Sequence, residues 1–231
     1  MLNEDSVKTM INSSGNVLLM VADGMGGHNK GEFASSEVVR IISEAFERKR
    51  GFINLYEASL WLKNIVRYSN SFIFRKQEND EDYANMGTTL IICLIFKNRL
   101  LILNCGDSRC YLLKNDELKQ ISEDQTYVNY LVKCGEITPE EALTHPKRHV
   151  LTNAIGLYPS ATFDFKIRKY NGETILLCSD GLYNEVSKIN MKNILLTDAN
   201  PIEKCKQLIN LANFNGGEDN SSVAIWESVH D

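Results

Sequence analysis

Four aspartates share one kind of position in this 231-residue sequence. Each stands beside an apolar run short enough to be a buried β-strand, and the four are Asp23, Asp107, Asp180 and Asp219. A strand end is a rigid support for a side chain. Carboxylates that converge repel one another unless a cation lies between them, and hard oxygen ligands favour Mg²⁺, Mn²⁺ or Ca²⁺ over zinc. Paired ions of this kind activate water and bind phosphoryl oxygens.

Each aspartate also has a plain structural interpretation. Asp-Gly is a common turn dipeptide, and aspartate often caps a helix, so any one of the four alone is better explained as a turn residue than as a ligand. Four at strand ends favour a metal site, but spacing in the sequence does not show that they meet in space. Both interpretations stay open on the pattern alone.

Covalent catalysis finds little support in the sequence. Ser179 or one of the six cysteines could be a nucleophile, but no adjacent histidine base is apparent. The cysteines include no CxxC pair, which argues against a zinc ribbon, and most stand in apolar runs typical of buried residues.

The elements that must position the aspartates follow from the apolar period. Strands are predicted at residues 16–22, 88–96, 100–105, 110–113, 118–121, 161–167, 173–178 and 222–227. Helices are predicted from residue 31 and at residues 55–76, 188–196 and 201–213. Residues 125–146 are polar with a weak helical pattern. This order predicts an α+β layered domain with antiparallel sheets rather than a doubly wound parallel one.

Composition limits the classes of partner. The apolar fraction of 43% is that of a globular chain, and a net charge of −5 gives no sign of nucleic-acid binding. The first ten residues lack the apolar segment of a signal peptide, and no apolar run is long enough to span a bilayer. We therefore expect a cytoplasmic protein with no membrane and no nucleic-acid partner.

Six short motifs occur in order along nearly the whole chain. They are NED at 3–5, VADGMGGH at 21–28 followed by GEFAS at 31–35, MGTT at 86–89, NCGDSR at 104–109, LCSDGL at 177–182 and GEDNSS at 217–222. Together they closely resemble the signature of the type 2C, metal-dependent protein phosphatases (the PPM family) in its bacterial form. The resemblance implies a four-layer α-β-β-α sandwich of two antiparallel sheets flanked by helix pairs. It also implies a single catalytic domain over residues 1–231.

The resemblance assigns roles to the acidic residues. Asp23 would bridge two metal ions and be central to catalysis, and the Gly24 carbonyl would bind one of them. Asp180 and Asp219 would complete the ligands of the first ion. Asp107, with Asp180, matches the position that binds a weaker third ion, so two or three Mg²⁺ or Mn²⁺ ions are expected.

Three more residues have roles by the same resemblance. Glu4 and Asp5 match acidic residues that bind metal-coordinated waters, which fits the way outer carboxylates orient such waters. His28 is a candidate general acid for the leaving alkoxide. Eukaryotic members have histidine directly after Asp-Gly, where this chain has Met25, so His28 has a second interpretation as a residue that only packs near the turn.

The implied function is hydrolysis of phosphoserine and phosphothreonine on proteins, by direct attack of a metal-bridging hydroxide without a phosphoenzyme. Its partners would be phosphorylated proteins, and it would oppose a serine/threonine kinase in bacterial signalling. Residues from about 123 to 150 correspond to a variable flap that would shape substrate choice, or else to an ordinary surface loop. Two alternatives stay open: a weakly active or inactive regulatory binding protein on the same fold, and a phosphatase of small phosphate esters.

Two departures from the family pattern carry expectations of their own. Family members usually have a strand before the NED motif, with an arginine that holds the substrate phosphate, and neither is apparent here. Arginine binds phosphate in a bidentate manner, so its loss should weaken substrate affinity. The second departure is Asn153, where many bacterial members have arginine.

Overall fold

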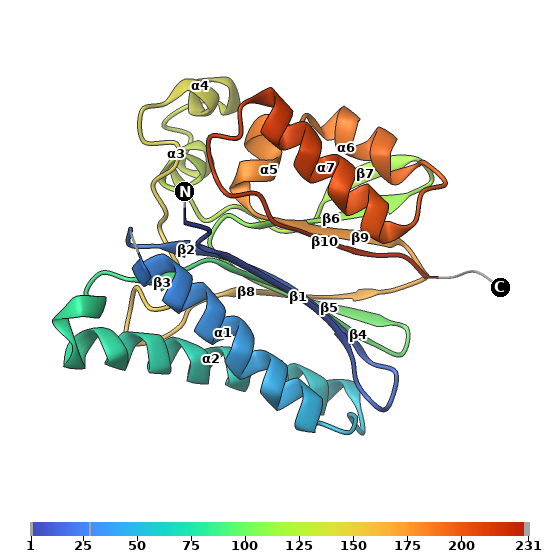
Figure 1. Ribbon diagram of the computed structural model, residues 1–231, viewed down its shortest axis with the longest axis horizontal. Coiled ribbons are helices and arrows are strands. Elements are labelled where there is room, and N and C mark those ends of the chain that lie inside the picture. Colours follow the sequence, from blue (N-terminus) through green and yellow to red (C-terminus); the bar gives the residue numbers. More distant parts are fainter. Residues whose placement is uncertain (1, 28, 229–231) are drawn as a thin grey trace.

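The protein is described by a computed structural model that covers residues 2–27 and 29–228. Two antiparallel sheets lie face to face, with helices on both outer sides (Figure 1). The first sheet has the order β1 (Asp5–Ile11), β2 (Val17–Met25), β4 (Leu90–Phe96), β5 (Arg99–Cys105) and β8 (Asp164–Lys169), and the short β3 (Gly87–Thr88) pairs with β2. The second has the order β10 (Val223–Trp226), β9 (Thr174–Cys178), β6 (Arg109–Lys114) and β7 (Glu117–Gln120).

Helices complete the outer layers. The first sheet is covered by α1 (Asn29–Arg48) and α2 (Leu55–Asn79), which is followed by the 3-10 helix η1 (Glu81–Tyr83). The second sheet is covered by α5 (Asp180–Glu185), α6 (Lys188–Leu195) and α7 (Pro201–Asn215). Two short helices, α3 (Tyr127–Cys134) and α4 (Pro139–Thr144), lie at one end of the sandwich (Figure 1). The predicted four-layer α+β class is confirmed.

The central strands are apolar without alternation because both of their faces are buried. In β2, Leu18 and Met20 pack toward the helices α1 and α2, whereas Leu19 and Val21 pack in the cluster between the two sheets. All four side chains have 0% exposure. A strand buried on both faces reads as a continuous hydrophobic run, which is the pattern that predicted it. This packing makes the strand ends rigid.

Sequence reasoning missed several elements, among them β1, η1 and α5, and misplaced the ends of others by a few residues. Residues 5–11 form the edge strand β1, whose partly exposed side chains give no apolar pattern. The helix α5 has only six residues, too few for a helical period to show. The strand predicted from residue 161 begins at Asp164. No helix among the described residues is long and apolar enough to cross a membrane.

Candidate metal centre

The first sheet brings two carboxylates together directly. Asp5 is the first residue of β1, and its register partner in the antiparallel strand β2 is Asp23. Residues opposite each other in such a pair point to the same face, with Cβ atoms about 5 Å apart. The Glu4 carbonyl accepts a hydrogen bond of 3.1 Å from the Gly24 amide, so the NED motif is held beside the Asp-Gly turn. A Cβ at Gly24 would collide with the backbone of Gly31, which explains the glycine.

The second sheet adds two carboxylates at the same end. Asp180 follows β9 as the first residue of α5, and Asp219 lies in the loop before the neighbouring strand β10. The Ser179 hydroxyl donates to Asp5 Oδ2 over 2.7 Å, which links the two sheets. The Asn220 side chain accepts a 2.8 Å bond from the Glu4 amide. Strand ends of both sheets therefore meet around one point.

Asp107 lies where the chain crosses from the first sheet to the second, between β5 and β6. Its exposure is 7%. The neighbouring Ser108 hydroxyl is 2.7 Å from that of Thr89, which in turn accepts a 3.0 Å bond from the Asp23 amide. Hydrogen bonds thus connect the Asp107 loop to the end of β2.

A cleft of about 880 Å³ opens over these residues. The sandwich contributes acidic residues and the segment 126–151 contributes apolar ones. The acidic residues are Asp23, Asp107, Asp124, Asp180, Glu185, Glu218 and Asp219, and the apolar ones are Val128, Val132, Pro139, Ala142, Leu143 and Leu151. Such a cleft can hold cations on its acidic side and can contact an apolar surface of a ligand on its other side.

The carboxylates disturb one another. Burial, and then the nearby charge of Asp5 and Asp180, raises the pKa of Asp23 well above its ordinary value. Burial is also the main reason why the pKa of Asp107 rises to about 7 and that of Asp5 to about 6. Ionising the whole group without a counter-charge is unfavourable, so a cation that enters the cluster relieves that cost.

The donor set fits a divalent cation. Asp180 Oδ1 is buried with no hydrogen-bond partner in the described structure, and burial and Asp219 raise the pKa of that carboxyl. A buried oxygen without a donor is an expected position for a missing ligand. Within residues 2–27 and 29–228, no group of three or more His, Cys, Asp or Glu side chains could hold an ion by itself. Mg²⁺ usually keeps several waters and one or two carboxylates, so this agrees with an oxygen site completed by water and carbonyl groups.

Six of the predicted site residues lie in the structure close to this point, and they are Glu4, Asp5, Asp23, Gly24, Asp180 and Asp219, with Asp107 beside them. His28 lies outside the described residues. Sequence reasoning missed two basic residues that line the cleft, Arg148 and His149. Both stand just after the polar segment 125–146, where no spacing marks them as functional.

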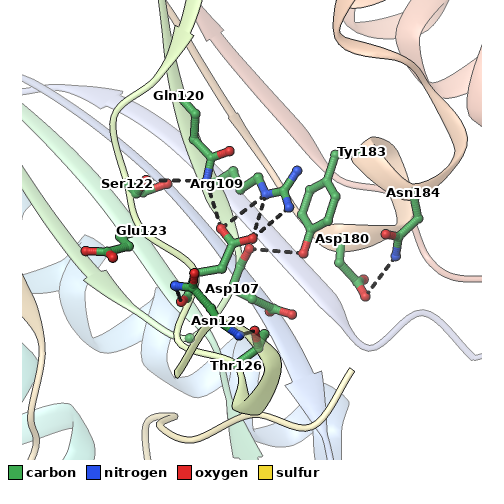
Figure 2. A network of polar contacts seen from close by, with 12 residues as sticks. Asp107, Arg109, Gln120, Ser122, Glu123, Thr126, Asn129, Asp180, Tyr183 and Asn184 are labelled. Carbon is green, nitrogen blue, oxygen red and sulfur yellow. Dashed lines mark hydrogen bonds and ion pairs between the residues drawn. The ribbon is translucent and has the colours of Figure 1, made fainter. Parts of the chain in front are cut away.

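Sequence reasoning also missed a polar network around Asp107, which Figure 2 shows. Arg109 forms an ion pair of 2.6 Å with Asp124 and stacks on the Tyr183 ring, with Cζ 3.3 Å from the ring centroid. The Tyr183 hydroxyl donates to the Asp107 carbonyl over 3.2 Å. Asp124 also accepts from the Gln120 amide at 2.8 Å. Arg109 is therefore occupied by Asp124, and its guanidinium is not free for a ligand.

Several known proteins similar to this chain are phosphatases. The family model described as protein phosphatase 2C matches residues 1–210. The serine/threonine phosphatase stp of Listeria welshimeri is 38% identical over 226 residues, which is 97% of this chain and 90% of that protein. The crystal structure of the serine/threonine phosphatase Stp1 from Staphylococcus aureus superposes with a TM-score of 0.92 at 34% identity, covering 100% of this chain and 91% of that one.

A further solved structure bears on the metal. The catalytic domain of the serine/threonine protein phosphatase PstP in complex with two manganese ions has a TM-score of 0.84 and is 37% identical, with 97% of this chain and 90% of that chain covered. The chain is thus similar to a protein whose catalytic domain holds two manganese ions.

Proposed function

Since the chain belongs to the protein phosphatase 2C family, we propose that the acidic cluster at the end of its sandwich is the catalytic metal centre. The family is metal-dependent, and the chain is a serine/threonine protein phosphatase whose substrates are phosphorylated proteins. The observation that carries the assignment is the meeting of Asp5, Asp23, Asp180 and Asp219 from both sheets at one point.

We assign the ligands by position in this cluster. Asp23 lies close enough to carboxylates of both sheets for their charges to affect it, and it would contact two Mg²⁺ or Mn²⁺ ions, with the Gly24 carbonyl beside it. Asp180 and Asp219 would hold the first ion, and the unpartnered Asp180 Oδ1 supports this. Asp107 would hold a third ion together with Asp180, whose charge already affects it. Bound ions of this type lower the pKa of a water molecule and neutralise phosphoryl oxygens.

Glu4 and Asp5 would orient waters at the edge of the cluster. The Ser179 hydroxyl fixes the Asp5 carboxylate, and hydrogen bonds to the Glu4 main chain fix the NED segment. A carboxylate held in this way directs the protons of a nearby water. These two residues would therefore determine how water is presented to the phosphate.

Attack by water is better supported than a covalent route. No cysteine or serine lines the cleft in the described structure. The hydroxyl of Thr89, which does line it, is engaged by Ser108 and the Asp23 amide and has no histidine base. A proton for the leaving alkoxide would come from His28, as the resemblance suggests, or from His149 in the cleft wall.

Substrate binding would involve residues 126–151, which correspond to most of the flap predicted at about 123–150 and are called the flap from here on. Arg148 lies on this segment and lines the cleft, and its guanidinium has no ion-pair partner in the part of the chain that the structure describes. A phosphate dianion entering an acidic cleft needs such a group. The apolar flap side chains would contact residues next to the phosphorylated one.

Hydrolysis of p-nitrophenyl phosphate and of a phosphothreonine peptide tests the assignment. With Mn²⁺ or Mg²⁺ the wild type should turn over both, and EDTA or Asp180→Asn should abolish turnover. Asp116→Asn is the matched control, because Asp116 lies in the exposed turn between β6 and β7 at a φ of 60°, which asparagine also adopts. A folded wild type without metal-dependent turnover would instead support a regulatory binding protein.

We further propose that this phosphatase acts in the cytoplasm and opposes a serine/threonine kinase. The names of its relatives support the class of substrate, and the kinase follows because a phosphorylated serine or threonine must be made by one. Comparing phosphoprotein levels in cells with and without Asp180→Asn would test this pairing. No rise in any phosphoserine or phosphothreonine protein in the variant would contradict it.

A further inference from the structure

The flap enters and leaves the sandwich through one narrow stalk. An isolated antiparallel bridge pairs Thr126 with Leu151. On the flap side of this bridge the Tyr127 amide donates to the Val150 carbonyl over 2.8 Å. On the core side the Thr152 amide donates to the Gln125 carbonyl, also over 2.8 Å. The orientation of the flap therefore depends on what holds this stalk.

Gln125 holds the stalk to the loop that carries Asp107. The Gln125 main-chain amide donates to the Gly106 carbonyl at 3.0 Å, and the Gln125 side-chain Oε1 accepts from the Gly106 main-chain amide at 2.9 Å. Gly106 packs closely against Thr89, because a Cβ there would lie 2.8 Å from the Thr89 side chain, and its φ of +103° favours glycine. A displacement of the stalk would thus be transmitted to the residue next to Asp107.

Asn153 closes the same junction from the outgoing side. Its Nδ2 donates to Gln125 Oε1 at 2.8 Å and to the Thr162 carbonyl at 2.9 Å, and the residue is 9% exposed. One oxygen of Gln125 therefore joins the Asp107 loop, the incoming strand and the outgoing strand. The unusual asparagine at this position has a defined partner.

A second connection runs from the residue before Gln125 to the other side of Asp107. Asp124 pairs with Arg109. Arg109 in turn packs on Tyr183, whose hydroxyl donates to the Asp107 carbonyl (Figure 2). The Asn129 side chain, in the first flap helix, donates to the Asp124 carbonyl at 2.5 Å. Residues 124 and 125, at the base of the flap, are thus connected by polar contacts to both sides of Asp107.

We propose that Gln125 and Asn153 are positioning residues that couple the orientation of the flap to the position of Asp107. This inference rests on the proposed metal centre, because the coupling affects function only if a cation binds beside Asp107. Binding of a cation beside Asp107 would favour the flap orientation that accepts a peptide. Because such a coupling acts in both directions, binding of a peptide to the flap would also favour binding of the cation. Neither residue touches the phosphate or takes part in the chemical step.

The test uses isosteric variants of the whole chain, Gln125→Met and Asn153→Leu, which keep volume and remove the shared hydrogen bonds. Two readouts are independent of activity: the Mn²⁺ concentration that gives half of the thermal shift, and amide hydrogen exchange of flap residues 127–150 with and without Mn²⁺. We expect the half-saturating Mn²⁺ concentration to rise about three- to tenfold, as the loss of one hydrogen bond predicts. Mn²⁺ should protect the flap in the wild type and less in either variant.

Activity adds a signature that a general loss of stability would not produce. KM for a phosphothreonine peptide should rise, while kcat for p-nitrophenyl phosphate at saturating Mn²⁺ changes little, because the small ester needs no flap. The double variant should be worse than Gln125→Met by no more than the loss of the bond from Asn153 to the Thr162 carbonyl, since both single variants remove the bond between Asn153 and Gln125. Thr138→Ala is the control within the flap: it breaks the capping box of α4 without touching the stalk.

The milder variant Thr152→Val replaces the others should they fail to fold, because it removes only the 2.9 Å bond from the Thr152 hydroxyl to the Gln125 carbonyl. Unchanged Mn²⁺ dependence together with unchanged flap exchange, in folded variants, would overturn the coupling. That result would leave the phosphatase assignment intact, since the latter depends on the loss of turnover in Asp180→Asn.

Discussion

At the scale of single residues, the carboxylates of the cleft are costly in the absence of metal. Burial raises the pKa of Asp107 to about 7, against an ordinary value of 3.8. A carboxyl with a raised pKa in the folded state stabilises the fold at pH values below its ordinary pKa, and that contribution is lost as the pH rises through the folded value. In EDTA, the stability of the protein should therefore fall progressively between about pH 4 and pH 7, and the full cost of ionised Asp107 should be present above pH 7.

Asp107→Asn removes this ionisation and leaves the shape of the side chain. In EDTA, we expect the variant to gain in Tm over the wild type, with a larger gain at pH 8 than at pH 5. Saturating Mn²⁺ should reverse the order, because the ion uses the charge that the variant lacks. Scanning calorimetry at both pH values measures this, and an equal gain at pH 5 and pH 8 would show that the charge of Asp107 is not the cause.

Arg148 should matter for substrate affinity rather than for the metal centre. We expect Arg148→Ala to raise KM for a phosphothreonine peptide by about tenfold, since a hydrogen bond to a charged group contributes roughly 1.5–3 kcal/mol. The Mn²⁺ dependence should not change. Steady-state kinetics would show this, with Lys147→Ala as control, because the Lys147 ammonium lies over the Tyr127 ring and does not line the cleft. Equal effects of the two substitutions would point to general attraction instead of a specific contact.

At the scale of elements, the helix α2 fixes the segment that follows the flap. Asn70 is 1% exposed, accepts a 2.8 Å bond from the Gly156 amide and donates at 3.0 Å to the Tyr158 carbonyl. Asn70→Ala leaves both main-chain groups without these partners, which should lower the free energy of unfolding by about 2–4 kcal/mol.

Urea unfolding measures the effect of Asn70→Ala. The control is Asn79→Ala in the same helix, whose side chain bonds the Arg75 carbonyl in an exposed position and should cost little. Half-saturating Mn²⁺ should stay the same in both variants. Comparable losses of stability in the two would mean that Asn70 has no special role as an anchor.

The elements also show what the sequence could and could not predict. The strands β2, β4 and β5 and the helices α1 and α2 were predictable because continuous or periodic burial leaves a pattern in residue type. The edge strand β1 was not, since half-exposed positions select no apolar period. Its absence from the prediction hid the direct pairing of Asp5 with Asp23, for which only the family resemblance gave a sign.

The same reasoning explains the residues of the site that were missed. Strand ends could be read from apolar runs, so the four aspartates were found. Arg148 and the Arg109–Asp124 pair take their roles from contacts between distant segments, and no local spacing encodes those. Asn153 was visible as a departure from the family pattern, but its partner Gln125 could be identified only in three dimensions.

At the scale of the whole molecule, metal should stabilise the fold because both sheets contribute carboxylates to the proposed metal centre. An ion that binds only the folded state at one hundred times its Kd adds about 2.7 kcal/mol. For a domain of this size, that corresponds to a rise in Tm of roughly 5–10 °C. Differential scanning fluorimetry with increasing Mn²⁺ tests it, and Asp180→Asn should lose most of the rise. A rise that is the same in wild type and variant would place the binding elsewhere.

The most direct measurement is a crystal structure of the wild type grown with Mn²⁺, with anomalous difference density to locate the ions. The account predicts two strong peaks in the cleft next to Asp23, one of them contacted by Asp180 and Asp219, and a weaker peak beside Asp107. Both strong peaks should disappear or weaken in Asp23→Asn crystals grown in the same way. Anomalous peaks away from this cluster, or a cleft without any peak at saturating Mn²⁺, would contradict the assignment of these carboxylates as the catalytic metal centre.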